Sequence, residues 1–198
     1  MLIFFQKNWF HISVWAGMII YLVFAHDLYI YFILKNGKPI LVNAELPAAA
    51  KGIKFHIDTF KPTVYDGQNL YSMIGWAFST ADPAMRPEDY ERNLVLVSGK
   101  KNYIFPTISS PRLSLQKAYQ SLGMELTNAG FSTIISQDVI KPGIYRIGII
   151  FHDHHKGSSS YTLTNKYLIR TPNQTQVSLT PTLSPTPAPP PLPSPISP

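Results

Sequence analysis

The sequence predicts a mostly β protein: an Ig-like antiparallel β-sandwich with one short helix, preceded by a single N-terminal transmembrane helix and followed by a disordered proline-rich tail. Three observations carry this prediction. Residues 9–34 contain a single formally charged side chain, that of Asp27. Short apolar runs separated by turn residues fill residues 53–172, a pattern typical of a sandwich. Nine of the 18 prolines fall within residues 181–198.

These patterns divide the chain into four parts. We expect a transmembrane anchor at residues 1–35, a linker at 36–52, the β-sandwich at 53–172 and a disordered tail at 173–198. The tail has too few large apolar side chains to offset the entropy of ordering, so extended polyproline II character is expected there. About 120 residues remain for the sandwich, enough to bury a core without disulfides or metals.

The anchor is longer than a membrane requires. At about 1.5 Å of rise per residue, a helix over residues 9–34 covers roughly 39 Å, whereas a bilayer core needs about 30 Å. A cleaved signal peptide has an apolar core of only about 7–15 residues. The length of this stretch therefore favours an uncleaved signal-anchor whose helix stays in the membrane.

His26 and Asp27 form a polar step two-thirds of the way along this helix. Ionisable groups inside a membrane are costly and mark candidate functional sites. Alternatively, the hydrocarbon segment ends just before the step, and Tyr29, Tyr31 and Phe32 form an aromatic belt at the outer interface. The second interpretation is favoured, with pairing to another span or to a lipid headgroup as the alternative.

Two features of the sequence disagree about the side of the membrane on which the domain lies. Lys7 precedes the span, and four lysines follow it: Lys35, Lys38, Lys51 and Lys54. The positive-inside rule therefore favours a cytoplasmic domain, but long domains cross membranes largely regardless of charge. The β-rich domain and the Pro/Thr/Ser tail are typical of exported proteins. We expect a single-pass protein of the cell membrane with an extracytoplasmic domain.

Residues 36–52 contain Asn-Gly, Lys-Pro and Leu-Pro pairs and are expected to form a loosely held linker. The apolar runs that follow predict seven strands, at residues 53–58, 70–80, 94–98, 103–106, 131–136, 144–152 and 161–170. Residues 66–67 and 99–102 predict turns, the second within a β-hairpin.

One stretch of the domain has helical periodicity. Apolar side chains recur at i, i+3, i+4 and i+7 within residues 114–122, namely Leu115, Ala118, Tyr119 and Leu122. Gly123 can end this helix. Trp76 lies in the apolar run 74–78 and is expected at the centre of the sandwich core, with a sugar-stacking surface as the alternative.

The composition excludes several classes of function. The chain has no cysteine, which excludes disulfides, thiolate metal sites and cysteine nucleophiles. Its net charge of +6 comes from scattered lysines without the basic runs of nucleic-acid-binding proteins, so no nucleic-acid partner is expected. The sequence also lacks a Gly-x-Ser-x-Gly elbow and a Gly-x-x-x-x-Gly-Lys-Ser/Thr phosphate-binding loop.

The densest cluster of metal-capable side chains is His152-Asp153-His154-His155. On a strand, His152 and His154 would face the same side, and two imidazoles with a carboxylate suit zinc or copper. The cluster runs directly into residues 156–160, which have the composition of a hairpin loop. We therefore expect a solvated turn and no bound metal or other cofactor, with the metal site kept as an alternative.

A second group of polar residues could be interpreted as catalytic. Glu88, Asp89 and Glu91 lie close together in the sequence. Glycosidases need two carboxylates that face each other across a cleft, at about 5–9.5 Å. Three acids on one short loop are more typical of a solvated turn, which is the expectation.

Five motifs follow one another along the sandwich: Gly75-Trp76-Ala77-Phe78, Leu94-Val95-Leu96, Tyr103-Ile104-Phe105, Gly130-Phe131-Ser132 and Gly143-Ile144-Tyr145-Arg146-Ile147-Gly148, with Lys166-Tyr167 near the end. This order resembles uncharacterised membrane-anchored β-sandwich proteins of bacteria, over roughly residues 53–171. It is also similar to sandwich modules that accompany cell-surface polysaccharide glycosyltransferases. The resemblance implies a glycan-related setting in the cell envelope. It implies no catalytic residue, because the transferase domain itself is missing.

The functional expectation is a non-enzymatic, membrane-anchored cell-envelope protein whose sandwich binds or scaffolds a protein or glycan partner. Its membrane partner is the lipid bilayer. One alternative is a metal-dependent enzyme that uses His152, His154 and His155. The other is an accessory subunit of a membrane complex, paired to another span through His26 and Asp27.

Overall fold

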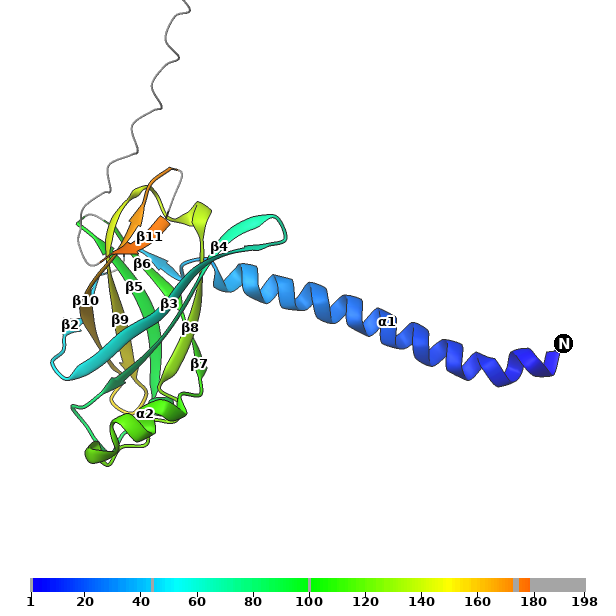
Figure 1. Cartoon of the computed structure of the whole chain (residues 1–198), viewed down its shortest axis with the longest axis horizontal. Coiled ribbons are helices and arrows are strands. Elements are labelled where there is room, and N and C mark those ends of the chain that lie inside the picture. The colour runs from blue at the N-terminus through cyan, green and yellow to red at the C-terminus, as the bar shows by residue number, and fades with distance from the viewer. Residues whose placement is uncertain (1, 44, 100, 173–174, 179–198) are drawn as a thin grey trace, which may run out of the picture.

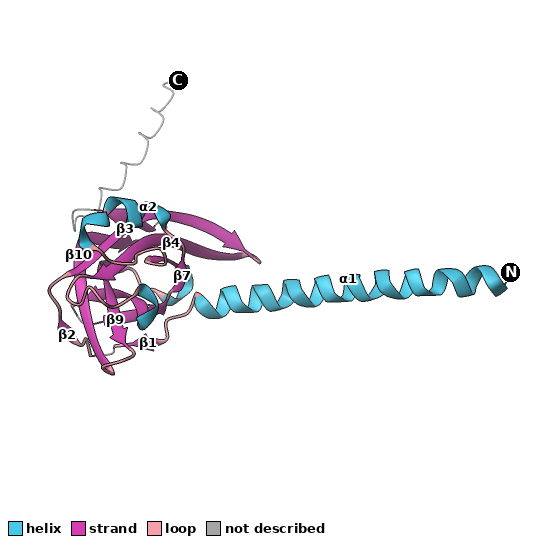
Figure 2. Cartoon of the chain, turned by 90° about the horizontal axis from the view of Figure 1, so that it is seen from below, coloured by secondary structure: helices cyan, strands magenta, loops and turns pink. Residues whose placement is uncertain are grey.

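The computed structural model describes residues 2–43, 45–99, 101–172 and 175–178. A long apolar helix, α1 (Leu2–Asn36), projects from a β domain built of two sheets (Figures 1 and 2). The helix covers nearly the same residues as the anchor predicted at 1–35 and extends beyond the apolar stretch 9–34 at both ends. Its membrane-compatible part is Ile12–Ile33, near the N-terminus. These 22 residues correspond to about 33 Å of helix, which matches the thickness of a bilayer core.

The larger sheet has seven strands in the described part of the chain. Its order is β1 (Leu41–Val42), β6 (Lys101–Pro106), β5 (Tyr90–Ser98), β9 (Gly143–Asp153), β10 (Ser158–Arg170) and β11 (Thr175–Ser178), and β2 (Ala48–Ala49) also pairs with β10. All of these pairings are antiparallel except that of β2 with β10. The sheet is therefore built mainly from hairpins, as the turn signals indicate.

The smaller sheet has four strands, in the order β3 (Ile53–Tyr65), β4 (Gln68–Ser79), β8 (Gly130–Ser136) and β7 (Ile108–Ser110). Short 3₁₀ helices lie in the connections, at η1 (Pro87–Asp89), η2 (Gln120–Leu122) and η3 (Gln137–Val139). The predicted strands are all present, although several are longer than the apolar runs that predicted them. The mostly β fold with one short helix is thus confirmed.

The core lies between the two sheets. Met73 and Ala77 of β4 point into it from the smaller sheet, and Leu94 and Ile149 point into it from the larger one, all with 0% exposure. Side chains alternate between the two faces of a strand, so every second residue of these strands contributes to the core. Apolar burial of this kind is the main force that holds the sheets together.

A buried arginine crosses from one sheet to the other. Arg92 of β5 is 3% exposed, and its guanidinium donates to the carbonyl oxygen of Ala77 on β4 (3.4 Å) and to Oγ of Ser109 on β7 (2.6 Å). It also donates to the carbonyl oxygen of Asn128 (3.0 Å). Burial lowers the pKa of Arg92 to about 10. These hydrogen bonds tie the sheets together at a point where the chain has no disulfide.

The expected position of Trp76 is wrong. On β4 the alternation places Met73 and Ala77 in the central core and Trp76 on the opposite, outer face of the smaller sheet. There the half-buried Trp76 stacks on His56 (ring centroids 5.7 Å apart) and packs edge-on against Tyr119 (5.8 Å). A small second cluster therefore forms beneath the short helix.

That short helix is α2 (Leu113–Ala118), which continues through Tyr119 into the 3₁₀ turn η2. Gly123 follows in the left-handed conformation (φ 65°) and ends the segment, as the sequence indicates. The predicted helix at residues 114–122 is thus confirmed in position but broken in two. Its apolar side covers the outer face of the smaller sheet rather than the central core.

Residues 36–52, expected to form a loosely held linker, make short backbone pairings with the larger sheet. Within this segment, Leu41 and Val42 pair with β6, while Ala48 and Ala49 pair with β10. The backbone N–H of Ile40 also donates to the carbonyl oxygen of Ile104 (2.8 Å). Edge strands carry unpaired backbone groups, and this segment, which we call the arm (residues 38–50), satisfies some of them.

The predicted boundary between the sandwich and the tail, at residue 173, lies before the last strand of the larger sheet. β11 lies within the range predicted to be disordered, yet it pairs with β10 from Arg170↔Thr175 to Tyr167↔Ser178. The sandwich therefore extends to Ser178. Residues 173–174 and 179–198 of the predicted tail lie outside the described residues.

Gly75 of β4 leaves room for the backbone of β3 and for the core side chain of Phe131 on β8. A Cβ atom at this position would overlap the carbonyl oxygen of His56 and lie 2.8 Å from Cζ of Phe131 in the core. We expect Gly75→Ala to lower the free energy of unfolding by about 1–3 kcal/mol, the usual cost of overpacking. Denaturant unfolding of the full chain in detergent measures this.

Gly99→Ala is the matched control for that variant. No atom lies within 4 Å of a Cβ built at Gly99, so its effect should stay within about 0.5 kcal/mol. Equal stability of the two variants would contradict the close approach at Gly75.

Candidate functional site

A groove of about 610 Å³ lies on the outer face of the seven-stranded sheet. The arm forms one wall through Ile40, Leu41, Glu45, Leu46 and Pro47, and the sheet supplies the floor through Glu91, Asn93, Ile104, Ile150, His152 and Ser159. Ile104 and Ile150 are 5% and 7% exposed and form a cluster separate from the central core. The groove thus has an apolar floor that the arm partly covers.

A row of polar side chains crosses the groove. Glu91 of β5, His152 of β9 and Ser159 of β10 are aligned by strand register. Nδ1 of His152 and Oγ of Ser159 are hydrogen-bonded at 2.9 Å, and Glu91 accepts a hydrogen bond from Nδ2 of Asn93, also at 2.9 Å. These bonds hold the polar groups at one side of the apolar floor.

This row resembles a Ser–His–acid set but lacks its geometry. In such a set the acid orients the imidazole that activates the serine. Between Glu91 and His152, both of them described residues, the structure contains no ion pair or hydrogen bond. In this structure Glu91 therefore does not orient the imidazole of His152.

The electrostatic character of the groove is acidic. Among its lining residues are the carboxylates of Glu45 and Glu91, and none of the lining residues is a lysine or an arginine. None of them carries an aromatic ring apart from the imidazole of His152. A partner of this groove would match it with apolar groups and a positive charge.

The histidines of residues 152–155 do not share one environment. His152 lies in the groove, and its ring contacts that of His154 edge-on at 5.7 Å, consistent with their spacing on one face. His155 turns away, with Nε2 lying 3.3 Å from Oδ1 of Asp89. Among the described residues there is no group of three or more His, Cys, Asp or Glu side chains placed to share a metal.

Asp153 organises the turn that follows these histidines. Its Oδ1 accepts hydrogen bonds from the backbone N–H groups of His155 and Lys156, both at 2.9 Å. Gly157 completes the turn with a positive φ of 62°. The N–H of Lys156 first, and then that of His155, hold the pKa of Asp153 below its ordinary value of 3.8. Asp153 is thus a structural carboxylate.

The three acids of residues 88–91 also have separate roles. Oδ2 of Asp89 accepts from the backbone N–H of Arg86 at 2.7 Å, which is the largest cause of its lowered pKa, and His155 adds to it. The side chain of Glu88 is hydrogen-bonded to Asn128. Only Glu91 faces the groove. The expected solvated turn is therefore an ordered one, and the three acids do not form a facing carboxylate pair.

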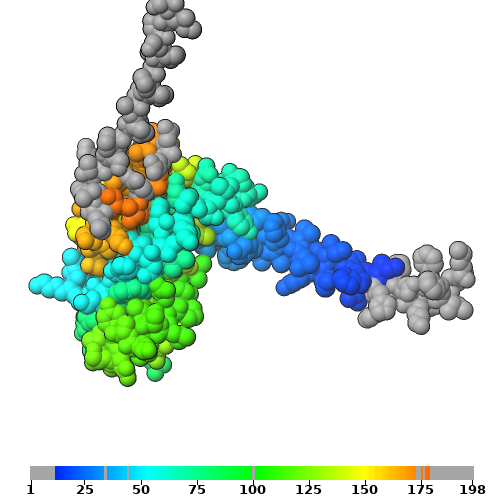
Figure 3. Space-filling view, viewed as in Figure 1, coloured from blue at the N-terminus to red at the C-terminus, as the bar shows by residue number. Residues whose placement is uncertain are grey.

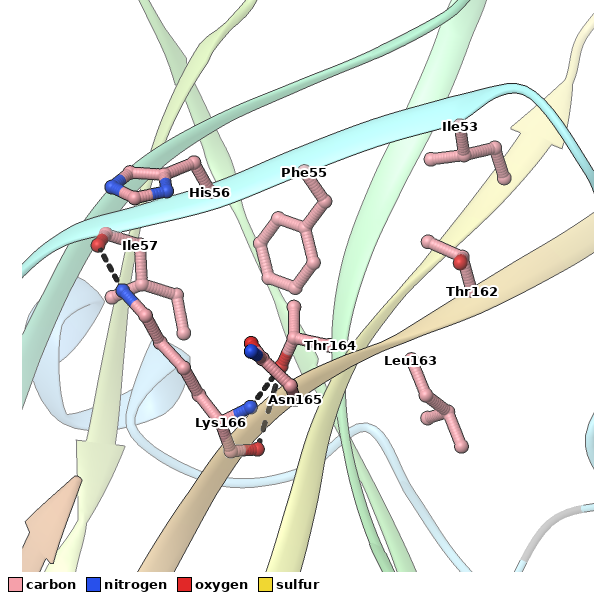
Figure 4. A pocket seen from close by; sticks show the side chains of 9 residues that line it. All are labelled: Ile53, Phe55, His56, Ile57, Thr162, Leu163, Thr164, Asn165 and Lys166. Carbon is pink, nitrogen blue, oxygen red and sulfur yellow. Dashed lines mark hydrogen bonds between the residues drawn. The ribbon is translucent and has the colours of Figure 1, made fainter. Parts of the chain in front are cut away.

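A smaller hollow of about 150 Å³ lies between β3 and β10, where the edges of the two sheets meet (Figure 4). Nζ of Lys166 reaches across it and donates to the carbonyl oxygen of Ile57 at 2.7 Å. Oγ1 of Thr164 accepts from the backbone N–H of Lys166 at 3.1 Å. These polar groups close the edge of the sandwich at the irregularity between Leu163 and Tyr167.

The polar step of the helix is exposed. Nδ1 of His26 and Oδ1 of Asp27 are 3.8 Å apart, and the two side chains are 66% and 73% exposed. Both therefore project from α1 toward its surroundings rather than toward the β domain.

Sequence reasoning singled out His152 but missed the groove around it. The sequence predicts a linker around Glu45 and Leu46 and a loop around Glu91. The alternation of β5 was a usable signal, because Glu91 and Asn93 share one face of that strand with Val95. Nothing in the sequence indicates that the arm folds back over this face.

The chain matches no protein-family model, no curated protein and no solved structure. The resemblance to membrane-anchored sandwich proteins of bacteria therefore stays a prediction.

The role of Asp153 makes the stability of the turn depend on pH. A lowered pKa in the folded state means that the carboxylate stabilises the fold above its ordinary pKa of 3.8, and that this contribution is lost as the pH falls through the lowered value. Asp153→Asn should therefore melt below the unmodified chain at pH 7, and this difference in Tm should shrink on acidification toward pH 2.

Asp66→Asn serves as the control, since Asp66 is an exposed turn residue whose positive φ of 48° asparagine also adopts. A difference in Tm for Asp153→Asn that is independent of pH would contradict the assigned role of the charge.

Proposed function

We propose that this protein is a non-enzymatic, single-pass protein of the cell envelope whose Ig-like sandwich lies outside the cytoplasm and binds a polypeptide segment in the groove under the arm. The observation that carries the proposal is the groove itself, with its apolar floor and its two carboxylates. A volume of about 610 Å³ falls in the range of about 300–1,000 Å³ typical of binding sites.

The lining of the groove favours a polypeptide over a glycan. Sugars are commonly recognised by stacking on aromatic faces, and among the described residues no Trp, Tyr or Phe lines this groove. Buried isoleucines beside carboxylates instead suit an extended segment that alternates apolar with basic side chains. The partner class is therefore an extended peptide with lysine or arginine next to aliphatic residues.

The surface of α1 supports the membrane anchor. Large apolar side chains along it are open, among them Trp15 (60% exposed), Tyr21 (71%) and Phe24 (71%). Apart from the contact of Tyr29 with Tyr65, the helix surface over residues 12–33 is largely open in the described chain. In water such a surface would be strongly unfavourable, whereas a lipid bilayer solvates it.

The location of the domain can be tested with single cysteines, because the chain has none of its own. Lys156→Cys places a thiol on an exposed turn of the sandwich. A membrane-impermeant maleimide should label it in intact spheroplasts, whereas Gln6→Cys, before the span, should be labelled only after lysis. The reverse pattern would place the domain in the cytoplasm.

The groove can be tested by binding of the detergent-solubilised full chain to arrays of extended peptides and of glycans. Peptides that alternate aliphatic with basic residues should bind, and Glu91→Lys should weaken that binding about tenfold or more, because a tenfold loss corresponds to only about 1.4 kcal/mol.

Glu125→Lys is the matched control for the groove variant. It makes the same change of charge at an exposed residue outside the groove and should leave binding unchanged. Glycan binding without peptide binding, or equal effects of the two variants, would contradict the proposed partner.

A further inference from the structure

The hairpin of β3 and β4 extends well beyond its neighbouring strand. β8 pairs with β4 only as far as Ser136↔Leu70, so residues 63–69, here called the hairpin tip, have no third strand beside them. Asp66 and Gly67 form its two-residue turn with φ of 48° and 70°. Two successive positive φ values match the twist of the strands and keep such a hairpin straight.

The tip projects along the side of α1 rather than away from it. Figures 1 and 2 show it reaching past the domain end of α1, and in Figure 3 it protrudes beside the helix. The rings of Tyr65 on the tip and Tyr29 on α1 meet edge-on, with centroids 5.9 Å apart. The hairpin tip therefore lies level with Tyr29.

The junction between α1 and the domain holds this arrangement. Gly37 follows the helix directly and is buried, and its carbonyl oxygen accepts a hydrogen bond from the backbone N–H of Ser136 at 2.8 Å. Its own N–H donates to the carbonyl oxygen of Ile33 at 3.0 Å, which continues the helix. The helix is thus joined to β8 at one point and to the hairpin at a second.

The level of Tyr29 fixes the depth of the tip in a membrane. If the hydrocarbon core ends at Ile33, Tyr29 lies about 6 Å inside that boundary, at 1.5 Å per residue. If the core ends at Ala25, just before the polar step, Tyr29 lies about 6 Å outside it. Both alternatives place the tip near the boundary between hydrocarbon and headgroups. The headgroup region of each leaflet is about 5–8 Å thick.

The side chains of the tip suit that zone. The apolar side chain of Val64 is 67% exposed. Tyr65 beside it has an apolar ring with a polar end, the type of residue enriched at membrane interfaces. Between Thr63 and Asn69 the only charged residue is Asp66, at the turn.

We propose that the hairpin tip is a second membrane contact, inserted among the lipid headgroups of the leaflet from which α1 emerges. The contact fixes the tilt of the helix and the sandwich together relative to the membrane surface, which a single span would leave free. The peptide groove lies on the outer face of the other sheet, so the membrane contact leaves it open. This inference rests on the proposed membrane anchor and is independent of the groove's partner.

Three single-cysteine variants of the full chain test the contact: Val64→Cys on the tip, Phe24→Cys in the span and Lys156→Cys on the remote turn. Each carries an environment-sensitive fluorophore and is placed in phosphatidylcholine nanodiscs at one chain per disc, so that a second copy cannot shield the label. The quenching of each label is measured with lipids that carry a spin label at the headgroup or high on the acyl chain. It is measured separately with iodide in the buffer.

The label at position 64 should be quenched several-fold more by the spin-labelled lipids than the label at position 156, and several-fold less by iodide. If the labels at positions 64 and 156 are quenched equally while the label at position 24 is buried in lipid, the tip contact is overturned and the anchor stays intact. A label at position 24 that iodide quenches freely would overturn the anchor and the contact with it. Val64 is exposed, so its substitution does not disturb the fold.

Discussion

The direct joint between α1 and the sandwich is the constraint on which the arrangement of this protein depends. Gly37 leaves no flexible residues between the last helical turn and the hydrogen bond to Ser136 of β8. A single hydrogen bond contributes only about 0.5–1.5 kcal/mol, but the contact of Tyr29 with Tyr65 gives the joint a second point. Two points define a direction, so the orientation of the domain follows from that of the helix.

The arm leads from this joint to the groove, so it connects the proposed membrane anchor with the proposed binding site. It passes from Gly37 to the edge of β6 and then on to β10, and on the way it supplies the wall of the groove through Glu45 and Leu46. Because the same segment starts at the helix and covers the groove, the groove is held at a set position relative to α1. A loosely held linker would not provide this.

The sandwich keeps its shape without a covalent brace. Its central core is apolar, and Arg92 adds hydrogen bonds from the larger sheet to β4 and β7 of the smaller one. Desolvation of a cation is costly, so this arginine contributes to a specific pairing of the sheets more than to net stability. The short helix α2 covers Trp76 and Phe78, which closes the outer face of the smaller sheet at the end opposite the hairpin tip.

The sequence by itself determined the apolar helix, the mostly β domain, the turn at Asp66-Gly67 and the end of α2 at Gly123, because each depends on local periodicity or on the φ preference of one or two residues. The tertiary structure alone decided the rest. Trp76 lies outside the predicted core because Met73 and Ala77 occupy the face of β4 toward the other sheet, while α2 covers the face that carries Trp76. The arm, β11, the groove and the contact of the hairpin tip with α1 join residues far apart in the chain, through backbone groups and rings whose partners no local pattern specifies.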